Sequence, residues 1–284
     1  MRQQLQNSEN KLSKKNNLWE GEYQVSQISY FNDEIKDSYQ KKIHLLLETT
    51  QDSNFHFQYS EFDFRKNDET SDTKASTLSQ LCVEVIYPIK FIVDIHGGLQ
   101  NVELIKSVSQ TQSELENVKH YFVDEFSSEY VDKMKKLIES PKIVFDKFKN
   151  TLVNSFLFNT VYSKKLSTTE ENFIYTEFYP WINDANPILF EIHNSILNTQ
   201  NSEQEFIHIK QKGICADYRS YEELYYKEFD NNDFFMNDNS IDCEFNAEYV
   251  INKENKSLKR IEATFENFVQ NNIEKETSLL ERLE

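Results

Sequence analysis

The chain has 284 residues, with 48 Asp and Glu against 31 Lys and Arg, so its formal net charge is −17. An aromatic fraction of 14% excludes disorder throughout, because disordered segments are poor in aromatic residues. Only four glycines occur, which leaves little from which to build a glycine-rich phosphate or dinucleotide loop. The negative charge and the lack of a Lys/Arg-rich run argue against a nucleic-acid partner and against binding to an anionic membrane, and we expect no nucleic-acid partner and no membrane partner.

The cysteines and the N-terminal residues bear on location. Cys82, Cys215 and Cys243 are odd in number and widely spaced, which is typical of a protein in the reducing cytoplasm. Residues 1–18 are polar and lack the apolar run of a signal peptide, so they are expected to form a flexible arm. No segment has the roughly 18 consecutive apolar residues of a membrane-spanning helix. We therefore predict a cytoplasmic protein.

Alternating apolar residues predict strands in the first third of the chain. Residues 22–30, 43–47 and 55–64 carry this period-two pattern, which places one face of each strand in the core. In the last of these segments the pattern changes parity at Ser60–Glu61, which predicts a β-bulge there. The polar segment Lys66–Ser79 is expected to be a mobile loop.

The strongest alternation runs from Leu81 to Ile95, where the apolar residues from Val83 onward occupy the odd positions. This pattern predicts one long strand, with Pro88 marking an edge or a bulge. His96-Gly97-Gly98 then predicts a hairpin turn into a strand over Leu99–Ile105.

The middle of the chain changes to helical spacing. Three amphipathic helices are predicted over residues 113–162, and the third begins at Ser140-Pro141, an N-cap followed by proline at the first helical position. Strand patterns return over Ile188–Ile196 and Phe206–Lys210, and an antiparallel meander is predicted from Ile241 to Leu283.

This order predicts an α+β fold: mostly antiparallel, curved β-sheet with a central three-helix segment packed on the sheet. After the arm at residues 1–18, we expect a sheet-rich half at 19–163, which contains the helical segment 113–162. A second sheet-rich half at 164–284 ends in the meander, and whether the two halves form one domain stays open.

Two short segments could carry chemistry. In the Asp94-to-Gly98 turn, Asp94 could orient the His96 imidazole of a hydrolase, and the glycines could supply oxyanion-hole amides. No Gly-x-Ser-x-Gly nucleophile motif accompanies them, so turn capping is the better interpretation. Cys215 could be a thiol nucleophile only with a positioned base, which the sequence does not identify. The six histidines lack zinc-ligand spacing, and we predict no metal and no cofactor.

The most unusual segment is acidic and aromatic. Between Tyr221 and Glu248, nine acidic residues stand against Lys227 alone, a local charge of −8. Aromatic and Met side chains can anchor a protein partner, and carboxylates speed encounter with a basic surface. The predicted partner-binding residues are Tyr225, Tyr226, Phe229, Asp230, Asp233, Phe234, Phe235 and Met236.

The leading hypothesis is therefore a non-catalytic protein-binding module, meaning an adaptor, an inhibitor or an assembly subunit, with a role beside a bacterial secretion or toxin system as one setting. Its expected partner is a protein with a basic surface, and homo-oligomerisation is left open. The alternatives are a hydrolase that uses Asp94 and His96, a carrier of an apolar small ligand between helices and sheet, and a nucleic-acid mimic. The carrier requires an empty cavity between helices and sheet, whereas solid packing there would argue against it.

Overall fold

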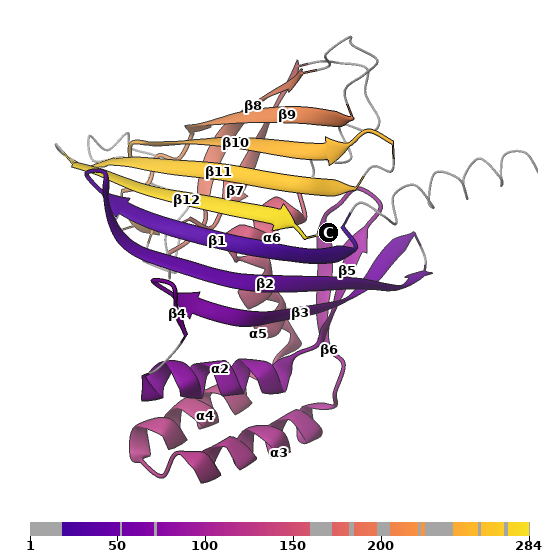
Figure 1. Cartoon of the computed structure of the whole chain (residues 1–284), viewed down its shortest axis with the longest axis vertical. Helices are drawn as coiled ribbons and strands as arrows, with labels where there is room; N and C mark the ends of the chain where they lie inside the picture. Colours follow the sequence, from indigo (N-terminus) through magenta and orange to yellow (C-terminus); the bar gives the residue numbers. More distant parts are fainter. Residues whose placement is uncertain are drawn as a thin grey trace, which may run out of the picture.

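The computed structural model describes residues 19–51, 53–70, 73–159, 172–181, 185–197, 205–220, 223–224, 241–254, 257–269 and 272–283. The predicted arm at residues 1–18 lies outside these ranges. The described residues form an α+β structure in which one large antiparallel sheet curls around helices on one of its faces (Figure 1). We call the face that packs against the helices the inner face and the opposite one the outer face.

The strands are β1 (Gly21–Phe31), β2 (Glu34–Gln51), β3 (Asn54–Lys66), β4 (Glu69–Thr70), β5 (Ile89–Asp94), β6 (Leu99–Leu104), β7 (Asn172–Tyr179), β8 (Ile188–Leu197), β9 (Phe206–Cys215), β10 (Cys243–Asn252), β11 (Leu258–Val269) and β12 (Asn272–Arg282). The helices are α2 (Lys74–Ile86), α3 (Val108–Val118), the short 3₁₀ helix η1 (Lys119–Tyr121), α4 (Glu125–Ile138), α5 (Pro141–Lys149) and α6 (Leu152–Leu157).

The sheet is open and runs in the order β6-β5-β3-β2-β1-β12-β11-β10-β9-β8-β7, with β4 paired to β3. Its central pairing joins the two ends of the chain, since β1 lies antiparallel to β12 with Val25 opposite Leu280. The two sheet-rich halves expected from the sequence therefore contribute to one continuous sheet. The predicted C-terminal meander is confirmed as β10, β11 and β12, in which Phe245 lies opposite Phe265 on the inner face.

Aromatic side chains fill the middle of the inner face. Phe156 and Phe158, at the end of α6, contact rings from both halves of the sheet: Phe156 lies 5.8 Å from Phe265, and Phe158 lies 5.5 Å from Phe91, between ring centroids. On β9, Gly213 leaves room for the Phe245 ring, because a Cβ at this position would lie 2.2 Å from a ring carbon. The centre of the fold is thus solidly packed.

The long strand predicted over Leu81–Ile95 is wrong, because its first half belongs to helix α2. Leu78, Cys82 and Ile86 are buried at intervals of four residues, whereas Val83 and Val85 are only half-buried. In this segment the apolar residues fit a period of two, as in a strand, and also a spacing of four, as in a helix. The helix ends before Tyr87-Pro88, since a residue that precedes proline favours extended backbone. Beyond it, β5 keeps the predicted alternation, and the predicted hairpin to β6 is confirmed.

Three further boundaries differ from the prediction. The bulge in β3 lies near Asp63, which has φ of 57°, because Glu61 still pairs with the buried Ile43. The predicted loop at Lys66–Ser79 contains β4 and the first turns of α2, and residues 71–72 are not described. The helical region begins earlier than residue 113, at α3, and holds α3 to α6 rather than three helices, because Thr151 caps a new helix after α5.

The sequence patterns predict no strand at the position of β7. This strand has apolar residues on both faces: Phe173 and Tyr175 pack against the core, while Ile174 and Phe178 are exposed. Apolar residues on both faces remove the alternation by which a strand is recognised.

Candidate functional site

A hollow of about 710 Å³ lies between α2 and the inner face of β1, β2 and β3. The sheet contributes Val25, Gln27, Tyr39, Lys41 and Phe64 to its lining, and the helix side contributes Thr73, Ser76, Ser79, Gln80 and Val83. Its volume falls within the range of about 300–1,000 Å³ that small-molecule sites occupy. Its walls combine apolar surface with hydroxyl, amide and ammonium groups.

Helix α2 forms one wall because its opposite side is anchored. Thr73 caps the helix by accepting a hydrogen bond from the Ser76 backbone N–H at 3.2 Å. Leu78, Cys82 and Ile86 are buried in the core. The Tyr130 hydroxyl of α4 donates to Ser79 Oγ at 3.1 Å, which fixes the helix from a second direction. The hollow is therefore bounded by an anchored helix on one side and by the inner face of the sheet on the other.

Four charged side chains line the hollow: Lys41 on β2, Arg65 and Lys66 at the end of β3, and Glu69 on β4. The one set deepest in the sheet is the Lys41 ammonium, whose side chain is 20% exposed. Its Nζ lies 2.8 Å from Oε1 of Glu61 on the neighbouring strand β3. The Tyr59 hydroxyl donates to the same carboxylate, and the Tyr87 hydroxyl also bonds to it. Glu61 thus accepts hydrogen bonds from two phenols and forms an ion pair with Lys41, while two of the three Lys41 N–H groups have no partner that the structure records among the described residues.

Burial raises the pKa of the Tyr59 and Tyr87 hydroxyls well above the usual value, and the Glu61 charge raises both further. Both phenols therefore stay protonated and act as donors to Glu61 rather than as bases. This cluster can orient the Lys41 ammonium, but it contains no group poised for proton abstraction.

A second polar position adjoins the hollow. Gln27 Nε2 donates to Oε1 of Glu276 on β12 at 3.2 Å. Burial raises the pKa of Glu276 to about 7, and the Gln27 hydrogen bond acts in the opposite direction. This carboxyl group therefore titrates near neutral pH.

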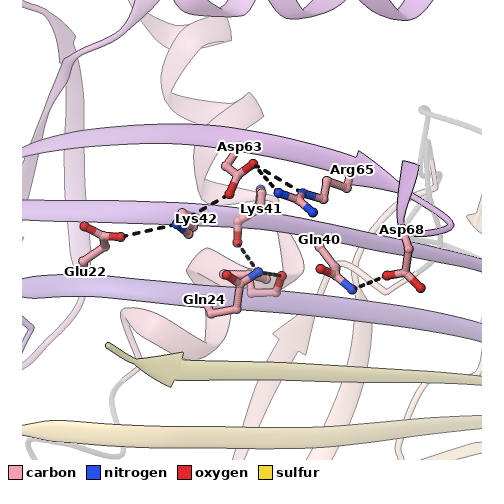
Figure 2. Close-up of polar contacts among 9 residues, drawn as sticks. Glu22, Gln24, Gln40, Lys41, Lys42, Asp63, Arg65 and Asp68 are labelled. Atoms are coloured by element: carbon pink, nitrogen blue, oxygen red, sulfur yellow. Dashed lines mark hydrogen bonds and ion pairs between the residues drawn. The ribbon is translucent and has the colours of Figure 1, made fainter. Parts of the chain in front are cut away.

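The outer face of the same strands is different, as Figure 2 shows. Lys42 Nζ lies 4.0 Å from Glu22 and 3.5 Å from Asp63, and Asp63 also accepts from Arg65 at 3.4 Å. These residues form a belt of exposed ion pairs across β1, β2 and β3. Glu22 and Asp63 thus lie on the opposite side of the sheet from Glu61.

A larger depression, of about 1,010 Å³, crosses the outer face of β7 to β11. Two of its charged groups already have partners: Glu248 lies 2.7 Å from Nδ1 of His208, and Lys212 lies 3.7 Å from Glu244 across the ladder. The hollow under α2 is the better candidate site despite its smaller volume, because it is walled by a helix as well as by the sheet.

The predicted Asp94–His96 site has the geometry of a capped turn. Asp94 Oδ1 accepts from the backbone N–H of His96 at 2.7 Å and from that of Gly98 at 3.0 Å, and Oδ2 accepts from the Gln100 amide at 2.7 Å. Gly97 has φ of 92°, which glycine adopts without strain. The His96 side chain is exposed. The Asp94 carboxylate bonds to amides and does not orient the imidazole.

Cys215 is the last residue of β9, and its side chain lies beside the thiol of a second free cysteine. The Cys243 thiol on β10 donates a hydrogen bond to the Cys215 sulfur. This hydrogen bond lowers the pKa of Cys215, while burial acts in the opposite direction. The Cys215 thiol also lies 3.9 Å from the Asp217 carbonyl oxygen. Asp217 forms an ion pair with Arg219, and the negative charges of Asp217 and Asp242 act to raise the pKa of Cys215.

The predicted partner-binding residues from Tyr225 to Met236 lie outside the described residues. Within the described ranges, no group of three or more His, Cys, Asp and Glu side chains could hold a metal ion. In the same part of the chain, no helix is long and apolar enough to cross a membrane.

The sequence did not single out Lys41, Gln27 or the α2 wall. One signal was present: Lys41 has the same parity as Ile43, Leu45 and Leu47, which places an ammonium on the inner face of β2. The α2 wall could not be recognised while its residues were interpreted as strand and loop.

Comparisons with known proteins give a fold likeness alone. No protein-family model and no curated protein matches the chain. Among solved structures, a lipovitellin structure described by its lipid–protein interactions matches with a TM-score of 0.50 and 8% sequence identity. The match covers 93% of this chain and 25% of the lipovitellin chain, so the protein spans about a quarter of that chain's length. At 8% identity, the match shows a likeness of fold alone.

Proposed function

We propose that the protein binds a small amphiphile, with an acyl-type chain and a polar headgroup, in the hollow under α2. The observation that carries the proposal is the hollow itself, walled by Val25, Phe64 and Val83 together with the Lys41 ammonium. Ligand sites of this kind combine mostly apolar walls with a few polar groups that fix orientation.

The packing of the inner face narrows the ligand class. Phe156 and Phe158 fill the centre of the sheet, so a large apolar ligand has no room there. The space that remains lies toward the rim, where polar groups interrupt the apolar wall. An amphiphile satisfies both kinds of surface, with its chain against Phe64 and Val83 and its headgroup near Lys41.

The likeness to lipovitellin supports the proposal at the level of fold, because a similar fold occurs in a structure described by its lipid–protein interactions. With 8% identity, no residue role is carried over.

The test is a titration with a fluorescent long-chain fatty acid in solution. Val83→Trp places a large ring in the hollow and should abolish the fluorescence change, whereas Glu84→Trp, on the exposed side of the same helix, should leave it intact. Lys41→Met should weaken binding, and Lys42→Met on the outer face should not. Binding that is equal in both variants of either pair would contradict the proposal.

Protein binding is a second proposal, and it rests on the acidic aromatic segment. Nine carboxylates and several aromatic side chains within 28 residues favour a basic protein partner, and cysteine usage favours a cytoplasmic one. Phe234→Ser with Phe235→Ser should abolish capture of such a partner from lysate. The same change should leave fatty-acid binding unaltered, which separates the two functions.

A further inference from the structure

Three apolar side chains project from the turn between α3 and α4. Tyr121 is 78% exposed, Val123 is 96% exposed and Phe126 is 61% exposed. We call these three residues the apolar tip. Burial of apolar side chains removes their surface from water, so the tip favours contact with something less polar than water.

The tip is held in place by its own turn. Phe122 packs against the core between the exposed residues. Asp124 caps α4 by accepting from the Ser127 backbone N–H at 3.1 Å and from the Ser127 hydroxyl at 2.6 Å. Lys74, in the first turn of α2, pairs with the same Asp124 carboxylate. The apolar side chains are therefore presented on a fixed support.

The tip also lies beside the hollow. Thr73 and Ser76 line the hollow at the start of α2, and the Lys74–Asp124 ion pair joins this end of the helix to the tip. Phe126 precedes Tyr130 by one helical turn, and Tyr130 donates to Ser79 in the wall of the hollow. Figure 1 shows the α3–α4 turn on the same side of the molecule as β4 and the start of α2.

The charges around the tip decide which surface it fits. Asp124, Glu125 and Glu129 flank it, and the neighbouring Lys119 pairs with Asp132 at 2.8 Å and with Glu116 at 3.4 Å. An anionic membrane attracts clusters of unpaired basic residues, which the tip lacks. The net charge of −17 also disfavours contact with an anionic membrane. A neutral lipid surface requires no basic residues and accepts aromatic and aliphatic side chains at the level of its headgroups.

We propose that the apolar tip inserts into a neutral, zwitterionic lipid surface and brings the adjoining hollow to the lipid from which its ligand comes. This proposal rests on the proposed amphiphile binding, because it names the lipid surface as the source of the amphiphile. Contact through three side chains is weak and reversible, which suits a protein that must leave the surface again. This proposal departs from the sequence-based expectation of no membrane partner.

Flotation of the full-length protein with phosphatidylcholine vesicles tests the proposal. The unaltered protein should float with the vesicles, and Val123→Ser with Phe126→Ser should lower its partition about tenfold or more. Ile174→Ser with Phe178→Ser is the matched control, since it removes two exposed apolar side chains from β7, far along the sheet, and should leave partition unchanged. Adding phosphatidylserine should reduce binding of the unaltered protein.

Failure of docking and failure of ligand binding give different results. The fatty-acid titration without vesicles should give the same affinity for the tip variant as for the unaltered protein. If fatty acid binds but the unaltered protein does not float, docking is overturned, and the tip is then left to a protein partner. If the protein floats in a tip-dependent manner without binding fatty acid, docking stands and the proposed function fails. Equal flotation of the tip and β7 variants, or stronger binding to anionic vesicles, would also overturn the proposal.

Discussion

Glu276 gives the sharpest quantitative prediction, because a carboxyl group with a raised pKa opposes folding at high pH. The residue lies on the inner side of β12, opposite Ser29, and burial raises its pKa to about 7 against an ordinary value of 4.5. The folded chain therefore holds a proton on Glu276 at pH values where the unfolded chain has lost it. Stability must fall as the pH rises from about 4.5 to about 7, and the loss is complete above that window.

The size of the effect follows from this difference. Each pH unit between the two pKa values corresponds to about 1.4 kcal/mol, so the ionised carboxylate costs about 3 kcal/mol at pH 8 and about 1 kcal/mol at pH 5. Glu276→Gln replaces the carboxyl group by a neutral amide of the same shape, whose oxygen can still accept from Gln27. The variant should be more stable than the unaltered protein by these amounts.

The assay is urea unfolding followed by circular dichroism at pH 5 and at pH 8. Glu281→Gln on the same strand is the control, since its side chain is exposed and its stability change should be small at both pH values. A gain for Glu276→Gln that is the same at pH 5 and pH 8, or no gain at pH 8, would refute the assignment of a buried, destabilising carboxylate.

Three further experiments, two with variants and one with the unaltered protein, test separate parts of the structure. Gly213→Ala should lower the free energy of unfolding by about 1–3 kcal/mol, because the added Cβ would overlap the Phe245 ring, and urea unfolding would show it; an unchanged midpoint would mean that the ring moves freely. Thr73→Ala should cost about 1 kcal/mol by removing the N-cap of α2 and should weaken fatty-acid binding, whereas Thr73→Ser should do neither. In native protein at pH 8, a thiol reagent should modify Cys215 before Cys82, since burial raises the pKa of Cys82 to about 11; the reverse order would contradict the structure.

The alternation of buried and solvent-facing residues was enough to predict much of the sheet. In β10, Cys243, Phe245 and Tyr249 face the core, so the period-two pattern is clean, and the turns on either side mark its ends. The hairpin at Gly97 could be predicted for a local reason as well, because the tight turn needs a positive φ. Such features depend on residues close together in the chain.

The pattern misled where a different period produced the same spacing. Between Leu81 and Ile86, apolar residues satisfy both a strand and a helix, and only burial of Leu78 and Cys82 against the core distinguishes the two. In β7, both faces carry apolar side chains, and the strand is defined by its pairing with β8. Local propensity cannot resolve either case, because the deciding contacts come from distant segments.

The sequence by itself determined the α+β class, the antiparallel meander and the negatively charged exterior. Only the tertiary structure decided that β1 pairs with β12 across about 250 residues of chain. This pairing joins the two halves into one open sheet. It alone brought Lys41, Glu61 and Tyr87 together and set α2 over them to leave a hollow. The physical reason is that alternation records which side chains are buried, whereas a site depends on which buried side chains meet.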